Sequence, residues 1–185
     1  VRSRGLGDVY KRQVEYVAWK AQEKKWYVDG EECPISAFLI DADSIKLGQG
    51  KLAAGVSPEW IWNESPGQKQ DIQEGFKKAF YLKIYMSKKH GSSVTEWREW
   101  MTTQRASRDA LMLLWNSVDK LERGKLMKVN VKGSKPTKMG EATVNVPVIT
   151  FDSWVDRPAD KVVEEPKDPV DKILSDDLED EIDWG

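Results

Sequence analysis

Aromatic and basic side chains alternate with aliphatic ones along residues 76–86, which read FKKAFYLKIYM. Successive side chains of a β-strand point to opposite faces, so this segment is expected to bury one face and expose the other. The apolar face holds Phe76, Phe80, Leu82, Ile84 and Met86, interrupted only by Lys78. The outward face holds Lys77, Ala79, Tyr81, Lys83 and Tyr85. Rings stack on nucleobases and ammonium groups follow phosphates, so the outward face predicts binding of single-stranded nucleic acid. The plainer alternative is that tyrosine is a good strand former.

Two further segments place tryptophans close together. Trp60 and Trp62 lie two residues apart in the strand-like segment EWIW, so both point to the same side. Trp97 and Trp100 flank Arg98 in the segment TEWREW. Each pair is a candidate platform for stacking on bases. Each could instead belong to the core, where the aromatic residues of a small domain are more often found.

Lysines gather on a ribbon predicted over residues 126–157 and at a turn before it. Two β-rich runs flank the loop GSKPTKMGE, whose glycines and proline favour a chain reversal. Met127, Val129 and Val131 alternate with polar residues, which gives the ribbon one apolar face. The basic residues expected to contact phosphates are Lys88, Lys89, Lys128, Lys132, Lys135 and Lys138.

Carboxylates raise the alternative of metal-dependent chemistry. Asp41 and Asp43 follow an apolar run and, at positions i and i+2, could share a strand face and hold a hard metal ion. With Glu59 and Glu64 they are the residues that a nuclease would use. The chain nevertheless has one histidine, one cysteine and no recognisable catalytic spacing. We therefore expect no catalytic residue, no metal and no cofactor.

The remaining pattern predicts a mostly β domain with one main helix. Residues 14–28 predict two strands around a turn, and residues 35–40 predict a buried strand. The glycine-rich residues 47–55 lack the spacing of a phosphate-binding loop and are expected to form a plain loop. Pro147 predicts that the return strand of the ribbon is an edge or bulged strand. Residues 104–123 predict the helix. Its apolar stripe is expected to pack on the sheet and comprises Ala106, Ala110, Met112, Leu113, Leu114, Trp115, Val118 and Leu121.

The two ends of the chain differ in composition from the middle. Residues 1–13 include SRGLGDVYKRQ, which resembles a translated sequencing adapter, and we expect them to lie outside the fold. Residues 159–185 carry a net charge of −8, whereas residues 14–158 carry +3. Many acids with few hydrophobic residues predict a disordered tail. The single Cys33 excludes an internal disulfide, and this fits a protein of the cytoplasm.

This organisation resembles that of phage-encoded single-stranded DNA-binding proteins. The likeness rests on an aromatic and basic β core, a β-ribbon arm and an acidic terminal segment over residues 14–185. It implies a β-barrel of the OB kind over residues 14–158 that binds single-stranded DNA without sequence preference during replication, recombination and repair. It also implies that the tail recruits replication or recombination proteins and competes with DNA. The tail residues that match the family are Asp176, Asp177, Glu179, Asp180, Glu181, Ile182, Asp183 and Trp184. The chain departs from the family in using tryptophan where phenylalanine is usual and in ending with Gly185.

Two other functions stay open at this point. One is a metal-dependent nuclease or another phage DNA-processing enzyme, which convergent carboxylates in a pocket would favour. The other is a phage adaptor or virion protein that binds no nucleic acid. An open face lined by Lys77, Tyr81, Lys83 and Tyr85 would favour the binding protein, and a homo-oligomer is compatible with the sequence.

Overall fold

The computed structural model describes residues 16–65, 67–92 and 94–158. The adapter-like residues 1–13 and the acidic residues 159–185 lie outside these ranges, and so do the expectations that concern them. The chain divides after Val155 into two units, and the fold described below is that of the first unit.

Within the described residues the fold is mostly β with one α-helix, as the sequence predicted. The strands number nine and belong to one sheet. The strands are β1 (Tyr16–Lys20), β2 (Lys25–Val28), β3 (Glu31–Glu32), β4 (Ala37–Lys51), β5 (Glu59–Trp62), β6 (Lys77–Met86), β7 (Glu96–Thr102), β8 (Lys125–Met139) and β9 (Ala142–Asp156). The helix is α2 (Arg105–Asn116), and a 3-10 turn, η1, spans Lys88–His90. No helix in these ranges is long and apolar enough to cross a membrane.

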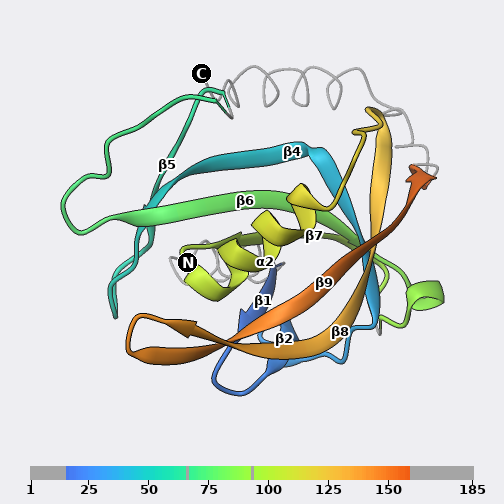
Figure 1. The fold of residues 1–185 in the computed structure, drawn as a ribbon, viewed down its shortest axis with the longest axis horizontal. Coiled ribbons are helices and arrows are strands. Elements are labelled where there is room, and N and C mark those ends of the chain that lie inside the picture. The colour runs from blue at the N-terminus through green and yellow to red at the C-terminus, as the bar shows by residue number, and fades with distance from the viewer. Residues whose placement is uncertain (1–15, 66, 93, 159–185) are drawn as a thin grey trace, which may run out of the picture. The chain divides into compact units, whose positions relative to one another are not determined.

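Strand β4 pairs with three other strands. β6 runs antiparallel along one edge of β4, while β8 and β5 share the other edge, β8 pairing with residues 37–40 and β5 with residues 48–51. The ladder with β6 shifts register between Asp41 and Lys46, which marks a bulge. Ser44 compensates there, because its hydroxyl accepts a hydrogen bond from the Lys83 backbone N–H at 2.7 Å. β4 bends sharply along its length (Figure 1), and its residues before the bulge pair with β8 on the edge opposite β6.

The sheet has two ends that no backbone ladder joins in the described residues. Its order is β3-β2-β1-β7-β6-β4-β8-β9, with β5 beside β4, and the β1–β7 pair is parallel. Pro147 lies in the end strand β9, so the predicted edge strand is confirmed. Side chains connect β1 to β9: the Trp19 indole donates to the Asn145 carbonyl at 3.0 Å, and the Asn145 amide donates to the Ala21 carbonyl at 2.9 Å.

The inward face of the sheet is apolar, as the alternation of residues 76–86 predicted. Ala79 was expected on the exposed face but is 4% exposed. Strand β6 buries the side chains of Phe80, Leu82, Ile84 and Met86. Trp100 of β7 lies among other rings, with its centroid 5.2 Å from Trp26 and 5.0 Å from Phe80, both in edge-to-face geometry. Trp26 belongs to β2, so the N-terminal hairpin contributes directly to the core.

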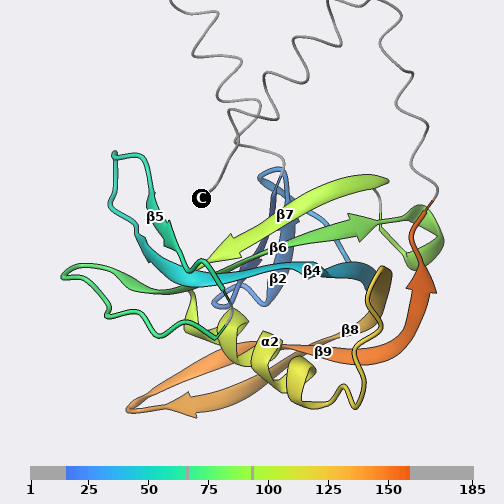
Figure 2. The same cartoon turned by 90° about the horizontal axis from the view of Figure 1, so that it is seen from above.

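Helix α2 lies between β4 and the β8–β9 hairpin in both views (Figures 1 and 2). It is shorter than predicted and ends at Asn116 instead of Arg123. The Ser117 hydroxyl donates to the Leu114 carbonyl at 2.6 Å, a local bond that competes with continuation of the helix. Its buried residues are Ala106, Ser107, Ala110, Leu111 and Leu114.

The apolar stripe of α2 is also narrower than predicted. Met112, Leu113 and Trp115 are 64%, 66% and 43% exposed, so the expectation that they pack on the sheet was wrong. The buried positions recur at intervals of three or four residues, whereas these three residues lie between them on the turned-away side of the helix. Leu121, which follows the helix, is 37% exposed as well.

Two segments expected to be loops are largely strands. The glycine-rich residues 47–55 begin inside β4, which continues to Lys51 because β5 and β6 pair with it there on both edges. Most of the loop at residues 133–141 belongs to β8, which runs to Met139 and leaves a turn at Gly140, where φ is 67°. In both cases pairing with neighbouring strands outweighs the turn-forming preference of glycine and proline.

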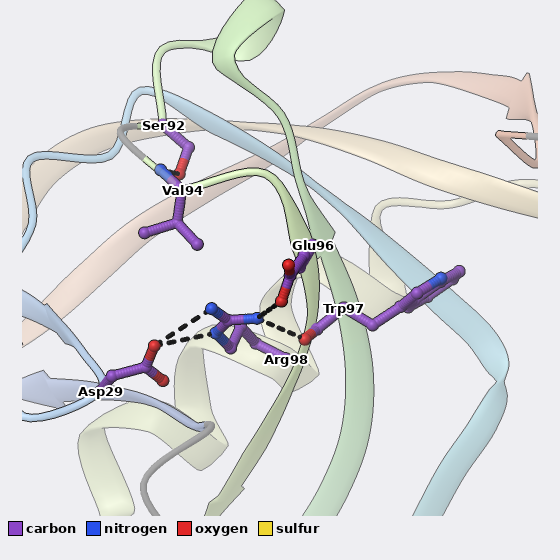
Figure 3. A network of polar contacts seen from close by, with 6 residues as sticks. All are labelled: Asp29, Ser92, Val94, Glu96, Trp97 and Arg98. Carbon is purple, nitrogen blue, oxygen red and sulfur yellow. Dashed lines mark hydrogen bonds and ion pairs between the residues drawn. The ribbon is translucent and has the colours of Figure 1, made fainter. Parts of the chain in front are cut away.

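Arg98 of β7 holds the N-terminal hairpin against the middle of the sheet (Figure 3). Its side chain is 8% exposed, and its Nε and Nη2 atoms lie 3.2 and 3.1 Å from the Asp29 carboxylate. The Nη1 atom donates to the Trp97 carbonyl at 2.8 Å and to the Glu96 carboxylate at 3.2 Å. A buried guanidinium is stable only when its donors are bonded, so this network ties the turn after β2 to β7.

We predict that Arg98→Leu lowers the free energy of unfolding by about 2 kcal/mol, because it removes several charge-assisted hydrogen bonds and leaves Asp29 without its guanidinium partner. The control is Arg123→Leu. Arg123 is 84% exposed and lies 3.9 Å from Asp43, so its loss should cost less than about 0.5 kcal/mol. Urea unfolding measures both, and equal effects would contradict the structural role of Arg98.

Candidate nucleic-acid interface

The outward sides of β5, β4, β6 and β7 form one continuous surface. Residues that are directly paired across neighbouring strands share a face of the sheet, so the pairing register defines this surface. Tyr85 pairs with Trp97, and Gly48 and Gly50 pair with Trp62 and Trp60. We call this surface the aromatic face and define it by the five rings that it carries, those of Trp60, Trp62, Tyr81, Tyr85 and Trp97.

The five rings form two contacting groups, and each ring is half-buried, so part of it stays open to solvent. Trp60 and Trp62 stack with centroids 5.4 Å apart and planes inclined by 7°, and Trp62 lies 6.0 Å from Tyr81. Tyr85 and Trp97 meet edge-to-face at 5.4 Å. Tyr81 and Tyr85 are four residues apart on β6, which separates the two groups by about 13 Å along an extended strand.

Two glycines of β4 make room for the tryptophans. A Cβ atom added to Gly50 would overlap the Trp60 ring, and one added to Gly48 would overlap the Ile61 carbonyl oxygen and lie 2.9 Å from the Trp62 ring. The indole rings therefore lean over bare backbone, a packing that also covers glycine in a strand. The Trp60 and Trp62 rings therefore lie on paired strands and not on a loop.

Tyr81 is held in place by Glu99, which lies on the neighbouring strand β7. Its phenol donates a hydrogen bond to the Glu99 carboxylate at 2.8 Å. Burial, together with this hydrogen bond, raises the pKa of Tyr81 above its ordinary value of 10. The phenol therefore stays neutral at physiological pH, and its ring keeps a fixed orientation beside Trp62.

Lysines border the rings on the same face. Lys46 pairs with Tyr81 across β4 and β6, and its Nζ lies 5.5 Å from the centroid of the Tyr81 ring. Lys77 and Lys83 are exposed on β6. Leu39, which pairs with Tyr85, also pairs with Lys128 of β8, so Lys128 continues the row that contains Tyr85. The aromatic face thus combines stacking surfaces with ammonium groups, and the acids Glu99 and Asp41, which both pair with Lys83, interrupt them.

Other predicted basic residues lie at the margins of this face or away from it. Burial and the ammonium groups of Lys128 and Lys89 lower the pKa of His90 in η1. Lys128 also forms an ion pair with Asp152 at 3.4 Å. The remaining predicted lysines are Lys88 in η1, which is exposed, and Lys132, Lys135 and Lys138 in the β8–β9 hairpin, also exposed. The tip of this hairpin lies on the far side of α2 from β6 in both views (Figures 1 and 2).

Trp100 does not belong to the aromatic face, and the expectation that it contacts nucleic acid is corrected. Trp97 and Trp100 are three positions apart on β7, an odd separation that points them to opposite faces of the strand. Trp100 is 1% exposed and fills the core, while Trp97 remains on the outside. A base could reach Trp100 only if the core opened.

The carboxylates considered for metal-dependent chemistry do not come together. Asp41 accepts a hydrogen bond from the Asp43 backbone N–H at 3.2 Å, and Asp43 accepts one from Gly124 at 3.2 Å, so both shape the bulge of β4. Glu59 and Glu64 lie in and after β5. Across the described ranges, no three His, Cys, Asp or Glu side chains are grouped so that they could hold a metal ion.

Sequence reasoning missed three residues of this site, namely Lys46, Gly48 and Gly50. The two glycines were assigned to a loop because glycine is depleted in strands, and Lys46 lay outside the predicted strands. A signal was present, since glycines at i and i+2 match tryptophans at i and i+2 in the next apolar segment. That pattern fits two paired strands whose large and small residues face each other.

We predict that Gly50→Ala lowers the free energy of unfolding by about 1–3 kcal/mol, because the added methyl group displaces the Trp60 ring. Gly67→Ala is the matched control, since a Cβ added at Gly67 meets nothing within 4 Å. Urea unfolding compares the two variants. An unchanged stability of the Gly50 variant would mean that Trp60 does not rest on β4.

The chain matches no known protein-family model. No curated protein and no solved structure matches it either. Its function is therefore inferred from the geometry of the aromatic face.

Proposed function

We propose that this protein binds single-stranded DNA without sequence preference and that the aromatic face is the binding surface. The supporting observation is that five half-exposed rings share one sheet face with exposed lysines. Every base offers a π-face to such rings, and ammonium groups neutralise phosphates whatever the sequence, so this combination binds single strands without reading them. No catalytic step is part of the proposal.

The connectivity of the strands supports a barrel of the OB kind. The OB fold is a five-stranded, partly open Greek-key barrel that binds oligonucleotides on the face of its second and third strands. We assign its strands to β4, β6, β7, β8 and β9: β4 is long and bent, β6 and β7 follow as a meander, α2 comes next, and β8 returns to β4. The second and third strands are then β6 and β7, which carry Tyr81, Tyr85 and Trp97.

The chain also has an addition to this plan. The hairpin of β1 and β2 lies beside β7, and β1 pairs with β7 in parallel at residues 16–17. In the proposed barrel β9 would pair with β7. In this chain the hairpin of β1 and β2 lies beside β7 instead. The hydrogen bonds between Trp19, Asn145 and Ala21 connect this hairpin to β9.

The biological setting that fits this surface is phage DNA replication, recombination and repair in the cytoplasm of the host. The protein would coat displaced strands, melt hairpins and pass the strands to a polymerase or recombinase. The acidic residues 159–185, with a net charge of −8, would recruit such partners and compete electrostatically for the DNA-binding surface.

We predict that Trp62→Ala and Tyr85→Ala each weaken binding of a fluorescein-labelled oligo-dT by about 1–3 kcal/mol, because each removes one stacking surface from a different end of the aromatic face. Anisotropy of the labelled strand is the readout, so the loss of a tryptophan does not bias it. Trp115→Ala is the matched control, an exposed ring on α2 that should leave the affinity unchanged. Wild-type affinity in both aromatic-face variants, with the fold intact by circular dichroism, would overturn the proposal.

The lysines of the same face should contribute through phosphates. The double variant Lys77→Gln with Lys83→Gln is expected to reduce the slope of log K against log salt by about 0.7 for each phosphate that is no longer neutralised. The hairpin variant Lys135→Gln with Lys138→Gln removes the same charge from the far side of α2. A reduced slope in the hairpin variant would extend the phosphate path to the hairpin, whereas an unchanged slope in both variants would contradict a phosphate path along β6.

A further inference from the structure

The aromatic face carries an exposed acid beside its rings, Glu99 of β7. The direct cross-strand partner of Glu99 on β6 is Lys83. Tyr81 lies two residues before Lys83 on the same strand, so Glu99 and the Tyr81 ring share the outer side of the sheet. Asp41 also pairs with Lys83, but its side chain is only 8% exposed. Glu99 is therefore the exposed carboxylate next to Tyr81.

The Glu99 carboxylate uses one of its two oxygens within the fold. Its Oε1 atom accepts the hydrogen bond from the Tyr81 phenol at 2.8 Å. Among the described residues no ammonium or guanidinium group forms an ion pair with Glu99, although Lys83 lies opposite it. An ionised carboxylate accepts hydrogen bonds through both of its oxygens. The Oε2 atom is therefore left as an acceptor on the aromatic face.

The negative charge of Glu99 opposes the binding of a polyanion such as DNA, so it calls for a compensating role. Holding the Tyr81 hydroxyl does not require this charge, because the neutral amide oxygen of a glutamine accepts the same hydrogen bond. A carboxylate differs from an amide in offering two acceptor oxygens and no donor. The presence of a carboxylate therefore indicates that its second oxygen receives a donor group from the ligand.

The groups around Glu99 are suited to hold one nucleotide. The centroids of the Tyr81 and Trp62 rings lie 6.0 Å apart, and both rings are half-buried stacking surfaces. The Nζ atom of Lys46 lies 5.5 Å from the centroid of the Tyr81 ring, and Lys83 is exposed on the same face, so ammonium groups flank the rings. The carboxylate lies at the hydroxyl end of the Tyr81 ring. A base that stacks on this ring therefore brings its edge close to Glu99.

The bases differ in what their edges offer to a carboxylate. Cytosine carries an exocyclic amino group that donates hydrogen bonds, and glutamate and aspartate side chains accept from this group in protein–DNA complexes. Thymine and uracil carry a carbonyl oxygen at the same position of the ring, which is an acceptor and is repelled by a carboxylate. An acceptor that lies beside a stacked base therefore distinguishes cytosine from thymine and uracil.

We propose that Glu99 makes the aromatic face prefer bases with an exocyclic amino group, such as cytosine, over thymine and uracil at the position that stacks on Tyr81. This inference rests on the proposed function and refines it, because the other rings and the lysines act on a strand of any sequence. The preference is modest, since water reaches an exposed carboxylate and competes for its hydrogen bonds. It is set by one residue, so one substitution is expected to remove it.

Two fluorescein-labelled strands of equal length, oligo-dC and oligo-dU, test this proposal by anisotropy at neutral pH. The strands have the same sugars and phosphates, and their bases differ only in the groups on the edge that Glu99 would read. In a homopolymer the same base occupies the Tyr81 position in every register, so the preference is not averaged out. The full chain is expected to bind oligo-dC about fivefold more tightly than oligo-dU, or better.

Glu99→Gln exchanges the free acceptor for a donor. The glutamine oxygen still accepts the hydrogen bond from Tyr81, which leaves the amide NH2 group facing the base, where it donates to the uracil carbonyl. This variant is expected to bind oligo-dU more tightly than the wild type does and to lose the preference for oligo-dC. The matched control is Glu141→Gln, which removes the same charge at the exposed turn between β8 and β9 and should leave the ratio of the two affinities unchanged.

The possible results separate this inference from the proposed function. Equal affinities of the wild type for the two strands would overturn the role of Glu99 and leave single-strand binding in place. A ratio that Glu99→Gln leaves unchanged, with the fold intact by circular dichroism, would do the same. An equal change of the ratio in Glu141→Gln would assign the effect to net charge and also overturn the role of Glu99. Binding of neither strand would overturn both proposals.

Discussion

The bend of β4 is the constraint on which the rest of the structure depends. β4 pairs with β6 along one whole edge, and on the other edge it pairs with β8 and then with β5. A straight strand could not pair with all three without forcing its partners apart. The bulge after Asp41 allows this, and it leaves the Lys83 N–H without its ladder partner. The Ser44 hydroxyl supplies that acceptor, so the bend does not leave this donor unpaired. The change of direction of β4 depends on these few contacts.

The same strand also builds the aromatic face. Beyond the bulge, β4 offers glycines to the tryptophans of β5, so the indole rings lie over backbone instead of over side chains. Before the bulge, Leu39 connects the row of Tyr85 and Trp97 to Lys128. A single bent strand therefore aligns rings from its neighbours β5 and β6 with lysines from β6 and β8. This alignment rests on backbone pairing, and binding would require little reorganisation of the surface.

Much of this could be read from the sequence, and the errors have physical causes. Alternation placed Phe80, Leu82 and Ile84 inward and Tyr81 and Tyr85 outward, because a period of two is a local property of a strand. The strand at Gly48 and Gly50 was missed because it depends on pairing with distant residues. The odd spacing of Trp97 and Trp100 already excluded a shared face. The width of the buried stripe on α2 could not be predicted, because it depends on how closely the helix approaches β8 and β9.

Core tryptophans and surface tryptophans perform different tasks in this chain, and the N-terminal hairpin connects them. Trp26 packs on Trp100 inside the sheet, while Arg98, between Trp97 and Trp100 on β7, bonds to the turn that follows Trp26. The hairpin thereby stabilises both faces of β7. The Trp26 ring packs on Trp100 on the inner face, and the Asp29 carboxylate binds Arg98, the residue next to Trp97. Surface rings depend on a well-packed core, because a ring whose position is already fixed loses less conformational entropy when a base stacks on it. The hairpin is thus an addition to the proposed barrel that stabilises β7, the strand that carries Trp97.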